Sequence, residues 1–486
     1  MLARVLTHAV VGLEARRIEV EAQLRGQQPA FVLVGLGDRA CQEAKERVRG
    51  GFDSSGLRWP DQRLTVNLAP AALRKEGAGF DLPIAIATLV ASGQIASDRV
   101  EGHAAVGEIA LGGHIRPVAG TVVVAEAARR AGAERILCAA ESAPEAALGG
   151  IDAIPVAHLR EAAEYLWGEL RIEPCAPPKR DGRPPTYLDL ADVRGQERAR
   201  RALELAAAGG HNLLLAGPPG TGKSMLAQRL PGILPPLTFD EALEVTRIWS
   251  VAGLLRAGEG LVQRRPFRWP HHSASMAAIV GGGGGRLRPG EATLAHNGVL
   301  LLDELPEFAR PALEALRQPL EDGSIAVARV EGRAVFPARF QLVGTMNLCP
   351  CGARGDPKAA CGCSPQRLAA FRDKLSRALL DRFDLVVTVP RPRALELAAA
   401  CGEPSQPVRK RVVTARARLA EAALPRTPDA DALLDRAVDR LPLSGRGRAR
   451  VARLSLTIAA LAGADAIDSE HVAEALGYRP PPELAA

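Results

Sequence analysis

Hydrophobic and polar positions along the first third of the chain follow strand and helix periods in alternation. Residues 17–21 alternate between apolar and polar side chains, which predicts a strand with one buried face. The apolar run at residues 31–34 predicts a strand that is buried on both faces. Helical patterns follow at residues 81–89 and 122–130. Residues 1–170 are therefore expected to form one α/β domain.

A change in composition ends this first region. Residues 174–185 carry five prolines among several charged residues, which is typical of a linker, and we place that linker at residues 171–187. Residues 188–392 again combine apolar runs with helical patterns and predict a second α/β domain. Residues 393–486 are rich in arginine and alanine and predict a helical C-terminal domain.

Length and charge narrow the class of protein. With 486 residues, the chain is long enough for about three domains. No apolar run approaches the roughly 20 residues of a membrane-spanning helix. The apolar stretch at residues 5–13 is interrupted by His8, unlike a signal peptide, so we expect a cytoplasmic protein with no membrane partner. The net charge of +7 permits a polyanionic partner but indicates one only weakly over this length.

A phosphate-binding loop begins the second domain. The apolar strand predicted at residues 212–216 leads into a complete GxxxxGK[ST] motif, and a helical pattern follows. The motif consists of Gly217, Pro218, Pro219, Gly220, Thr221, Gly222, Lys223 and Ser224. Its glycines let backbone amides converge on phosphate oxygens at a helix N-terminus. Lys223 is expected to reach the β- and γ-phosphates of ATP, and the Ser224 hydroxyl to hold Mg²⁺.

An acidic pair completes the expected nucleotide site. Asp303 and Glu304 directly follow the apolar strand predicted at residues 299–302. The carboxyl ends of such strands line the crevice where α/β sheets bind ligands. Asp303 is suited to the Mg²⁺ shell, and Glu304 is suited to polarise the attacking water as a base. The two motifs together predict an ATPase.

Several longer motifs resemble the magnesium-chelatase-like AAA+ ATPases of the YifB/ComM family. They lie at residues 65–70, 75–83, 267–275, 281–285, 289–291 and 295–298, so the resemblance covers nearly the whole chain. It implies a Lon-protease-like N-terminal α/β domain, a three-layer AAA+ domain with the phosphate loop, and a C-terminal helical lid. It also implies a hexameric motor, and the family includes a DNA helicase that drives branch migration during natural transformation.

The resemblance also assigns roles to three further residues. Asn347, which ends the strand predicted at residues 341–346, matches the first sensor and would orient the water beside Glu304. Arg382 matches the arginine finger, which contacts the γ-phosphate in a neighbouring subunit. Arg446 matches the second sensor, although two other arginines lie close to it in the sequence. A turn asparagine and a surface ion pair remain the plain alternatives for Asn347 and Arg382.

The N-terminal domain lacks the residues that Lon-type proteolysis requires. That chemistry needs a serine nucleophile and a lysine base. The segment expected to carry the serine, residues 77–82, has no hydroxyl side chain, and no lysine occurs between Lys75 and Lys179. The lysine would follow a hairpin, which Gly112 and Gly113 predict with a two-residue loop. We expect an inactive domain that serves oligomerisation or substrate engagement.

Four arginines are candidates for contact with DNA. Arg286 and Arg288 follow five successive glycines at residues 281–285. Arg329 and Arg333 flank the turn of a hairpin predicted to reverse at residues 331–332. Arginines that face the channel of a ring could follow a phosphate backbone without reading its sequence. Ordinary solvated loops remain the alternative, because exposed arginine is common.

Four of the eight cysteines are clustered in the sequence. Cys349, Cys351, Cys361 and Cys363 form two CxC pairs that directly follow Asn347. Such pairs could hold a tetrahedral Zn²⁺, although the usual spacing within a pair is longer. Free cysteines remain the alternative, because cysteine packs well as a small hydrophobic side chain.

Two functions are compatible with the sequence. The first is a hexameric, ATP-driven motor that binds and moves on DNA and promotes branch migration. The alternative is a chelatase-like or chaperone-like motor that remodels a protein partner. ATP and Mg²⁺ are expected cofactors of both, with Zn²⁺ as a further candidate.

Overall fold

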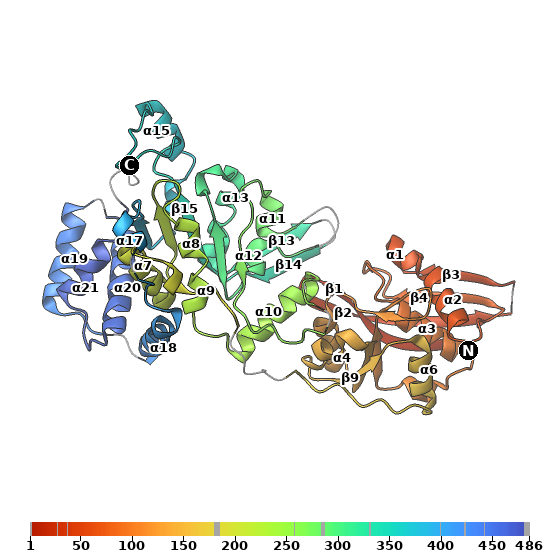
Figure 1. Ribbon diagram of the computed structural model, residues 1–486. Helices are drawn as coiled ribbons and strands as arrows, with labels where there is room; N and C mark the ends of the chain where they lie inside the picture. Colours follow the sequence, from red (N-terminus) through yellow and green to blue (C-terminus); the bar gives the residue numbers. More distant parts are fainter. Residues whose placement is uncertain are drawn as a thin grey trace.

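The computed structural model describes residues 2–26, 28–35, 37–178, 185–256, 258–282, 287–329, 332–398, 400–421, 424–441 and 443–480. It forms three parts that lie side by side: a mixed sheet with its helices, a parallel sheet with its helices, and a C-terminal group of helices (Figure 1). In the described residues, no helix combines the length and apolar character needed to cross a membrane.

A seven-stranded mixed sheet is the centre of the N-terminal part. Its strand order is β3-β4-β2-β1-β5-β8-β9. The strands are β1 (Leu2–Val11), β2 (Glu14–Arg25), β3 (Ala30–Val34), β4 (Arg63–Ala69), β5 (His103–Val106), β8 (Arg135–Ala139) and β9 (Asp152–Val156). The β2 strand pairs antiparallel with β1 and β4, and the other neighbouring pairs are parallel.

Helices cover both faces of this sheet. They are α1 (Arg39–Gln42), α2 (Ala44–Ser54), α3 (Asp81–Ala91), α4 (Thr121–Arg130), α5 (Ala143–Ala147) and α6 (Leu159–Trp167), with short 3-10 turns at Ser97–Val100 and Ala140–Ser142. One core contains α2, α3 and α6, and another contains α4 and α5. Every residue of α3 is buried. The helices expected at residues 81–89 and 122–130 are thus confirmed.

Two strand predictions for this domain need correction. The run at residues 31–34 was expected to be buried on both faces, but β3 is the edge strand and Val34 is 47% exposed. An apolar run cannot distinguish a central strand from an edge strand, because strand order depends on distant segments. The apolar stretch at residues 5–13, which the sequence distinguishes from a signal peptide but does not assign to an element, belongs mainly to β1 in the interior of the sheet.

The glycine-rich hairpin also differs in detail from its prediction. Strands β6 (Glu108–Ile109) and β7 (Ile115–Arg116) pair antiparallel, which confirms the hairpin. The Ala110 amide donates to the His114 carbonyl at 2.9 Å, so the loop has three residues rather than two. Gly113 is in the left-handed region, with φ of 84°. A two-residue loop would instead have placed Gly112 and Gly113 at its two central positions.

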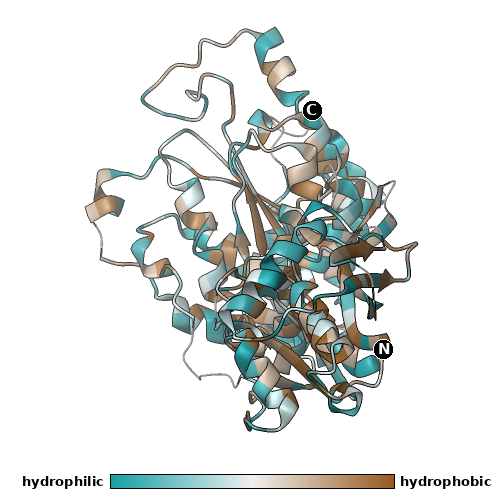
Figure 2. Ribbon diagram, turned by 90° about the vertical axis from the view of Figure 1, so that its right-hand side faces the viewer, coloured by the Kyte–Doolittle hydropathy of each residue, from teal (hydrophilic) through white to brown (hydrophobic). Residues whose placement is uncertain are grey.

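The central part contains a five-stranded parallel sheet in the order β11-β12-β15-β10-β16. Its strands are β10 (Leu213–Ala216), β11 (Phe267–Arg268), β12 (Val299–Leu302), β15 (Gln341–Met346) and β16 (Leu385–Thr388). Leu213 and Leu215 pack into one core, whereas Leu214 and Ala216 pack into a core on the opposite face. The apolar run of β10 is therefore explained by burial on both faces, and the hydrophobic colour of the central strands is visible in Figure 2.

Short helices and one hairpin surround this sheet. The helices are α7 (Glu197–Gly209), α8 (Lys223–Ala227), α9 (Leu230–Ile233), α10 (Phe239–Val251), α11 (Met276–Val280), α12 (Glu291–Leu294), α13 (Arg310–Glu314), α14 (Arg317–Asp322), α15 (Pro365–Arg372) and α16 (Arg377–Leu380), with 3-10 turns at Leu190–Asp192 and Leu305–Glu307. The hairpin consists of β13 (Ser324–Arg329) and β14 (Gly332–Pro337).

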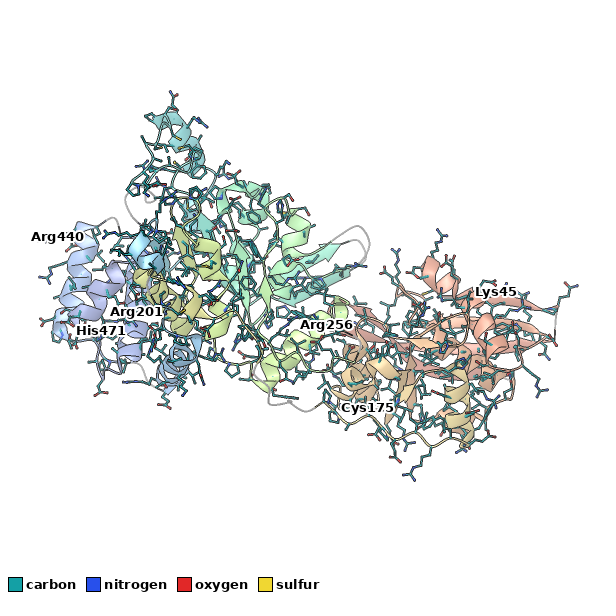
Figure 3. The ribbon with its side chains drawn as sticks, viewed as in Figure 1. Lys45, Cys175, Arg201, Arg256, Arg440 and His471 are labelled. Atoms are coloured by element: carbon teal, nitrogen blue, oxygen red, sulfur yellow. The ribbon has the colours of Figure 1, made fainter. Side chains whose placement is uncertain are left out.

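The C-terminal helices share a core with the parallel sheet. They are α17 (Ala394–Ala398), α18 (Ser405–Glu421), α19 (Pro428–Arg440), α20 (Gly445–Ala462) and α21 (Ser469–Leu476). Apolar side chains of α18, α19, α20 and α21 belong to the same cluster as those of α7 and β10, whereas α17 has no buried residue. Arg201 on α7, labelled in Figure 3, also pairs with Glu474 on α21 at 3.0 Å.

The N-terminal domain docks on α10 through α4 and α5. Arg247 on α10 pairs with Glu126 on α4, with 2.7 Å between Nε and Oε1. The Gly120 amide donates to the Ser250 carbonyl at 3.1 Å, and the Ser250 hydroxyl donates to Glu145. Burial raises the pKa of Glu145, which also accepts a hydrogen bond from the Val122 amide at 2.9 Å. Polar side chains of the two domains therefore bond to one another across this contact.

Candidate nucleotide site

The phosphate loop, residues 217–224, leaves the carboxyl end of β10 in the interior of the parallel sheet. The Gly217 amide donates to the Met346 carbonyl at 3.1 Å. A Cβ atom at Gly217 would lie 2.2 Å from the Val389 carbonyl oxygen, so only glycine fits there. Gly222 has φ of 87° immediately before α8, a conformation that side chains rarely adopt.

Lys223 lies under this loop and is buried. Its Nζ donates to the carbonyl oxygens of Gly217 and Pro218, both at 2.8 Å, and to Asn347 Oδ1 at 3.2 Å. Burial lowers the pKa of Lys223, and the nearby carboxylates of Asp303 and Glu304 oppose that shift. The loop thus holds a cation beside the amides that would receive phosphate.

Ser224 and Asp303 come together as the motifs predict. The Ser224 hydroxyl lies 2.8 and 2.9 Å from the two carboxylate oxygens of Asp303. A hydroxyl and a carboxylate are oxygen ligands of the type that Mg²⁺ prefers, so the donor set fits this ion. The ion would share its remaining positions with water and nucleotide phosphates.

Thr345 is a member of the site that sequence reasoning missed. Its hydroxyl donates to Asp303 Oδ1 at 2.5 Å and accepts a hydrogen bond from the Glu304 amide at 3.0 Å. Glu304 is exposed and has φ of +56°, a strained conformation for a residue other than glycine. Thr345 therefore fixes the backbone turn that directs Glu304.

Asn347 lies between the two motifs, because β15 separates β10 from β12 in the sheet. Its contact with Lys223 places a polar side chain next to the phosphate loop, as expected for the first sensor. The structure thus brings together Lys223, Ser224, Asp303 and Asn347, with Glu304 adjacent.

Arg382 does not contact these residues within the chain. Its side chain is 11% exposed and forms an ion pair with Glu321. Burial lowers the pKa of Arg382, as do the charges of Arg446, Arg317 and Arg450. Arg446 is exposed in the first turn of α20. The two arginines assigned by resemblance therefore lie in one basic group.

The four candidate DNA residues are only partly described. Arg286 lies outside the described residues, and so does the side chain of Arg329. Arg288 is exposed, and its carbonyl accepts a hydrogen bond from the Gly282 amide at 3.1 Å. Arg333 is exposed on β14. Arg329 pairs with Gly332, so Gly332 belongs to β14 and not to the turn where it was predicted. Residues 330–331 lie outside the described part of the chain.

The long motifs of the central domain form internal contacts. Arg268 forms a two-bond ion pair with Glu291, at 2.6 and 2.8 Å. His296 accepts from the Arg339 amide through Nδ1 at 3.0 Å, so Nε2 carries the proton that bonds Glu244 at 2.9 Å. These motif residues position the strands beside the site.

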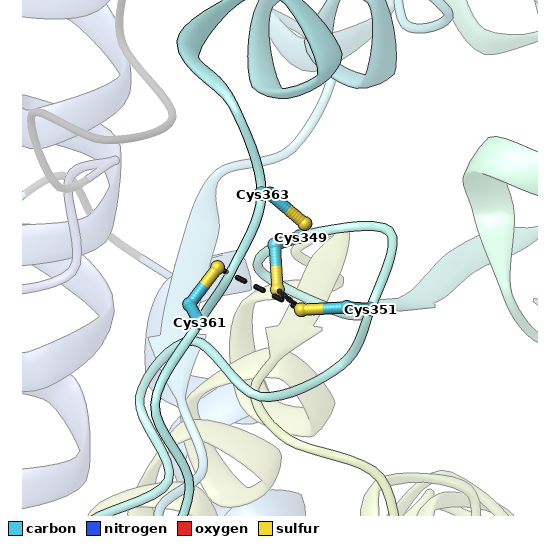
Figure 4. A group of neighbouring side chains, drawn as sticks. All are labelled: Cys349, Cys351, Cys361 and Cys363. Carbon is cyan, nitrogen blue, oxygen red and sulfur yellow. Dashed lines mark hydrogen bonds between the residues drawn. The ribbon is translucent and has the colours of Figure 1, made fainter.

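The four sulfur atoms of Cys349, Cys351, Cys361 and Cys363, here named the cysteine cluster, lie within 4.8 Å of one another (Figure 4). The cluster follows Asn347 directly in the chain. The four thiols that the sequence left as either a zinc site or free cysteines therefore lie together.

A phosphate loop after an interior parallel strand, with an acidic pair two strands away, defines a P-loop nucleotide-binding protein of the AAA+ class. A family model described as magnesium chelatase, subunit ChlI, matches residues 189–397. Models described as subunit ChlI of Mg-chelatase and its C-terminal region match residues 20–142 and 402–479.

Full-length relatives agree with these matches. Protein YifB of Salmonella typhimurium is 42% identical, with 98% of this chain and 97% of that protein covered. Competence protein ComM of Haemophilus influenzae is also 42% identical over 98% and 97%. The chain belongs to the YifB/ComM family of magnesium-chelatase-like AAA+ proteins. A shorter match is the Holliday junction branch migration complex subunit RuvB of Rhodococcus erythropolis. It is 28% identical, over 38% of this chain and 41% of that protein.

Proposed function

We propose that this protein is a hexameric AAA+ motor that hydrolyses ATP, moves on DNA and promotes branch migration in natural transformation or recombination. The convergence of Lys223 and Asn347 on the phosphate loop, beside the Ser224–Asp303 pair, carries the ATPase part. Lys223 would contact phosphate oxygens, and Asn347 would orient water toward Glu304. Ser224 and Asp303 would hold Mg²⁺, which would supply positive charge to offset that of the phosphates.

The hexamer part of the proposal rests on Arg382 and Arg446. Neither has a described bond to the phosphate loop of its own chain, and their charges lie close together. In a ring, this basic group would meet the phosphates bound by the neighbouring subunit. Arg382 would exchange Glu321 for the γ-phosphate, since a guanidinium makes similar two-bond contacts with both groups.

The DNA part is supported by exposed arginines on two projecting segments, Arg288 near the glycine-rich loop and Arg333 on the β13–β14 hairpin. The names of the relatives ComM and RuvB point the same way. Contacts of this kind bind phosphates regardless of sequence and weaken as salt rises.

ATPase rates of the full-length chain, measured with and without DNA, test this function. We expect a branched four-way junction or single-stranded DNA to stimulate hydrolysis. Lys223→Ala should abolish nucleotide use, whereas Glu304→Gln should retain ATP binding and lose hydrolysis, because only the base is removed. Normal turnover by Glu304→Gln would contradict the assigned base.

The salt dependence of DNA affinity tests whether individual arginines contact DNA phosphates. Arg333→Ala should lower DNA affinity and reduce the slope of log affinity against log salt by about 1. Arg116→Ala, which removes an exposed arginine from the N-terminal domain, is the matched control. A chain that shows neither DNA stimulation nor salt-sensitive DNA binding would overturn the DNA part.

A protein-remodelling motor is the second candidate. It is favoured by two exposed apolar side chains near the 267–275 motif, Trp269 at 48% and Met276 at 49% exposure. Such side chains could bind apolar segments of an unfolded peptide. Stimulation of the ATPase by an unfolded protein, with none by DNA, would select this candidate. We propose no peptidase activity, because residues 77–82 carry no hydroxyl nucleophile.

A further inference from the structure

The cysteine cluster has nearly the dimensions of a tetrahedral metal site. The sulfur atoms of Cys349 and Cys351 are 3.3 Å apart, and those of Cys351 and Cys361 are 3.7 Å apart. In a Zn²⁺ site with Zn–S bonds of about 2.3 Å, the edges of the sulfur tetrahedron are about 3.8 Å. All four sulfurs lie within 4.8 Å of one another, so small side-chain rotations would complete the tetrahedron.

Ordinary packing explains only one of these thiols. Cys349 is buried, but Cys351 is exposed and the remaining two are half-buried. Exposed or half-exposed thiols gain little from packing as hydrophobic side chains. The Arg354 amide also donates to Cys349 Sγ at 3.2 Å, a hydrogen bond of the kind that orients and stabilises metal-bound thiolates.

The segment that carries the cluster has few other means of holding its shape. Residues 347–364 are all described and form neither helix nor strand between β15 and α15. One ion pair, between Asp356 and Arg391 at 2.9 Å, ties the segment to the chain after β16. Leu348 packs against the core of the parallel sheet, but a segment with no backbone ladder and so few apolar contacts commonly depends on a metal or another cross-link.

This segment also rests on the phosphate loop. A Cβ atom at Gly352 would lie 3.0 Å from Pro219, and one at Gly355 would lie 3.9 Å from Pro218. The same segment begins with Asn347, which bonds Lys223. The conformation of this segment therefore affects both Pro218 and Pro219 of the phosphate loop and the position of Asn347 beside Lys223.

We propose that the cysteine cluster binds one structural Zn²⁺ and that this ion holds residues 347–364 against the phosphate loop. Four thiolates would saturate the ion and leave no position for water or substrate, so its role is structural rather than catalytic. Loss of the ion would release the segment and weaken nucleotide binding by the adjacent loop.

Metal content of the full-length protein, purified without chelator from zinc-supplemented cells, tests the site directly. We expect about one Zn²⁺ per chain, released when a thiol-modifying reagent is added. The double variant Cys361→Ser/Cys363→Ser should lose the metal. Cys401→Ser, which removes an exposed cysteine outside the cluster, should retain it. Replacement of zinc by Co²⁺ should give the intense absorption of tetrahedral cobalt thiolate.

The outcome does not depend on the proposed DNA activity. Wild-type protein with less than about half a zinc per chain and no cobalt thiolate spectrum would overturn the proposal. So would an unchanged zinc content in the double variant. If zinc is bound, its removal should lower the affinity for a fluorescent ATP analogue several-fold, and re-addition should restore it. Equal affinity with and without zinc would overturn the proposed link to the phosphate loop.

Discussion

Thr345 connects the two acidic residues that the nucleotide site requires. Its hydroxyl bonds the carboxylate of Asp303 and the backbone amide of Glu304. The β12–β15 register, in which Leu302 faces Gly344, brings these groups side by side at the strand ends. A single hydroxyl thus supports both the proposed Mg²⁺ ligand and the proposed base.

Replacing Thr345 by valine keeps the shape of the side chain but removes that hydroxyl. We expect the ATPase kcat to fall by about tenfold or more, because residues that orient metal ligands have effects of this size. The affinity for nucleotide without Mg²⁺ should change little. Steady-state ATPase and nucleotide titrations check this, with Thr345→Ser as the control that keeps the hydroxyl. A normal kcat in Thr345→Val would contradict the role.

The sequence was informative where a residue's role follows from its neighbours in the chain. The phosphate loop and the acidic pair are contiguous motifs, so Lys223, Ser224 and Asp303 could be identified directly. Thr345 could not, because its role arises from the pairing of β12 with β15, which are far apart in the sequence. The same holds for Arg382, whose partner Glu321 belongs to α14.

At the scale of elements, local patterns predicted which segments are helices and strands better than they predicted where those elements lie. The β3 strand is at an edge despite its apolar sequence. The start of β14 differs by one residue from the prediction, because Gly332, expected in the turn, pairs with Arg329. The contact of the β1–β2 turn with the β13–β14 hairpin had no signal in the sequence. It depends on Gly12, whose added Cβ would lie 2.7 Å from Ala334 Cβ.

Gly12→Ala should therefore disturb the contact between this turn and the hairpin. Gly12 has φ of 63°, so alanine also costs roughly 1–2 kcal/mol of backbone strain. Gly56→Ala is a matched control, because Gly56 has φ of 65° and open space around it. We expect faster hydrogen exchange at residues 324–329 and 332–337 in Gly12→Ala only. Equal exchange in both variants would show that the contact does not restrain the hairpin.

At the scale of the whole molecule, the nucleotide site of one chain is incomplete if Arg382 acts on a neighbour. Arg382→Ala should then lower the ATPase rate of the assembled ring by about 10³-fold, with ATP binding retained. Lys223→Ala should also be inactive, but because it removes the contact of the phosphate loop with the nucleotide phosphates. Mixed rings of the two variants contain some interfaces with an intact lysine and an intact arginine.

Mixing the two inactive variants should therefore restore part of the activity. ATPase rates at several mixing ratios measure this recovery, and each variant alone is the control. No recovery in rings shown to be mixed would exclude action between subunits. An active Arg382→Ala ring would remove the arginine from the mechanism.

The position of the N-terminal domain on the central part could not be predicted from the sequence either. Glu145 and Ser250 are unremarkable polar residues in the sequence, and their importance comes only from mutual burial. Both domains could be recognised from their motifs, whereas their arrangement depends on a few side chains that satisfy each other.

That docking has a mechanical consequence. The α10 helix belongs to the segment between the phosphate loop and the acidic pair, and it carries Arg247 and Ser250, which hold the N-terminal domain. The domain extends far to one side of this attachment (Figure 1). It is thus a lever arm held at α10 and, through Gly12, at the β13–β14 hairpin, and a small rotation about these contacts would move the far edge of the arm through a large arc.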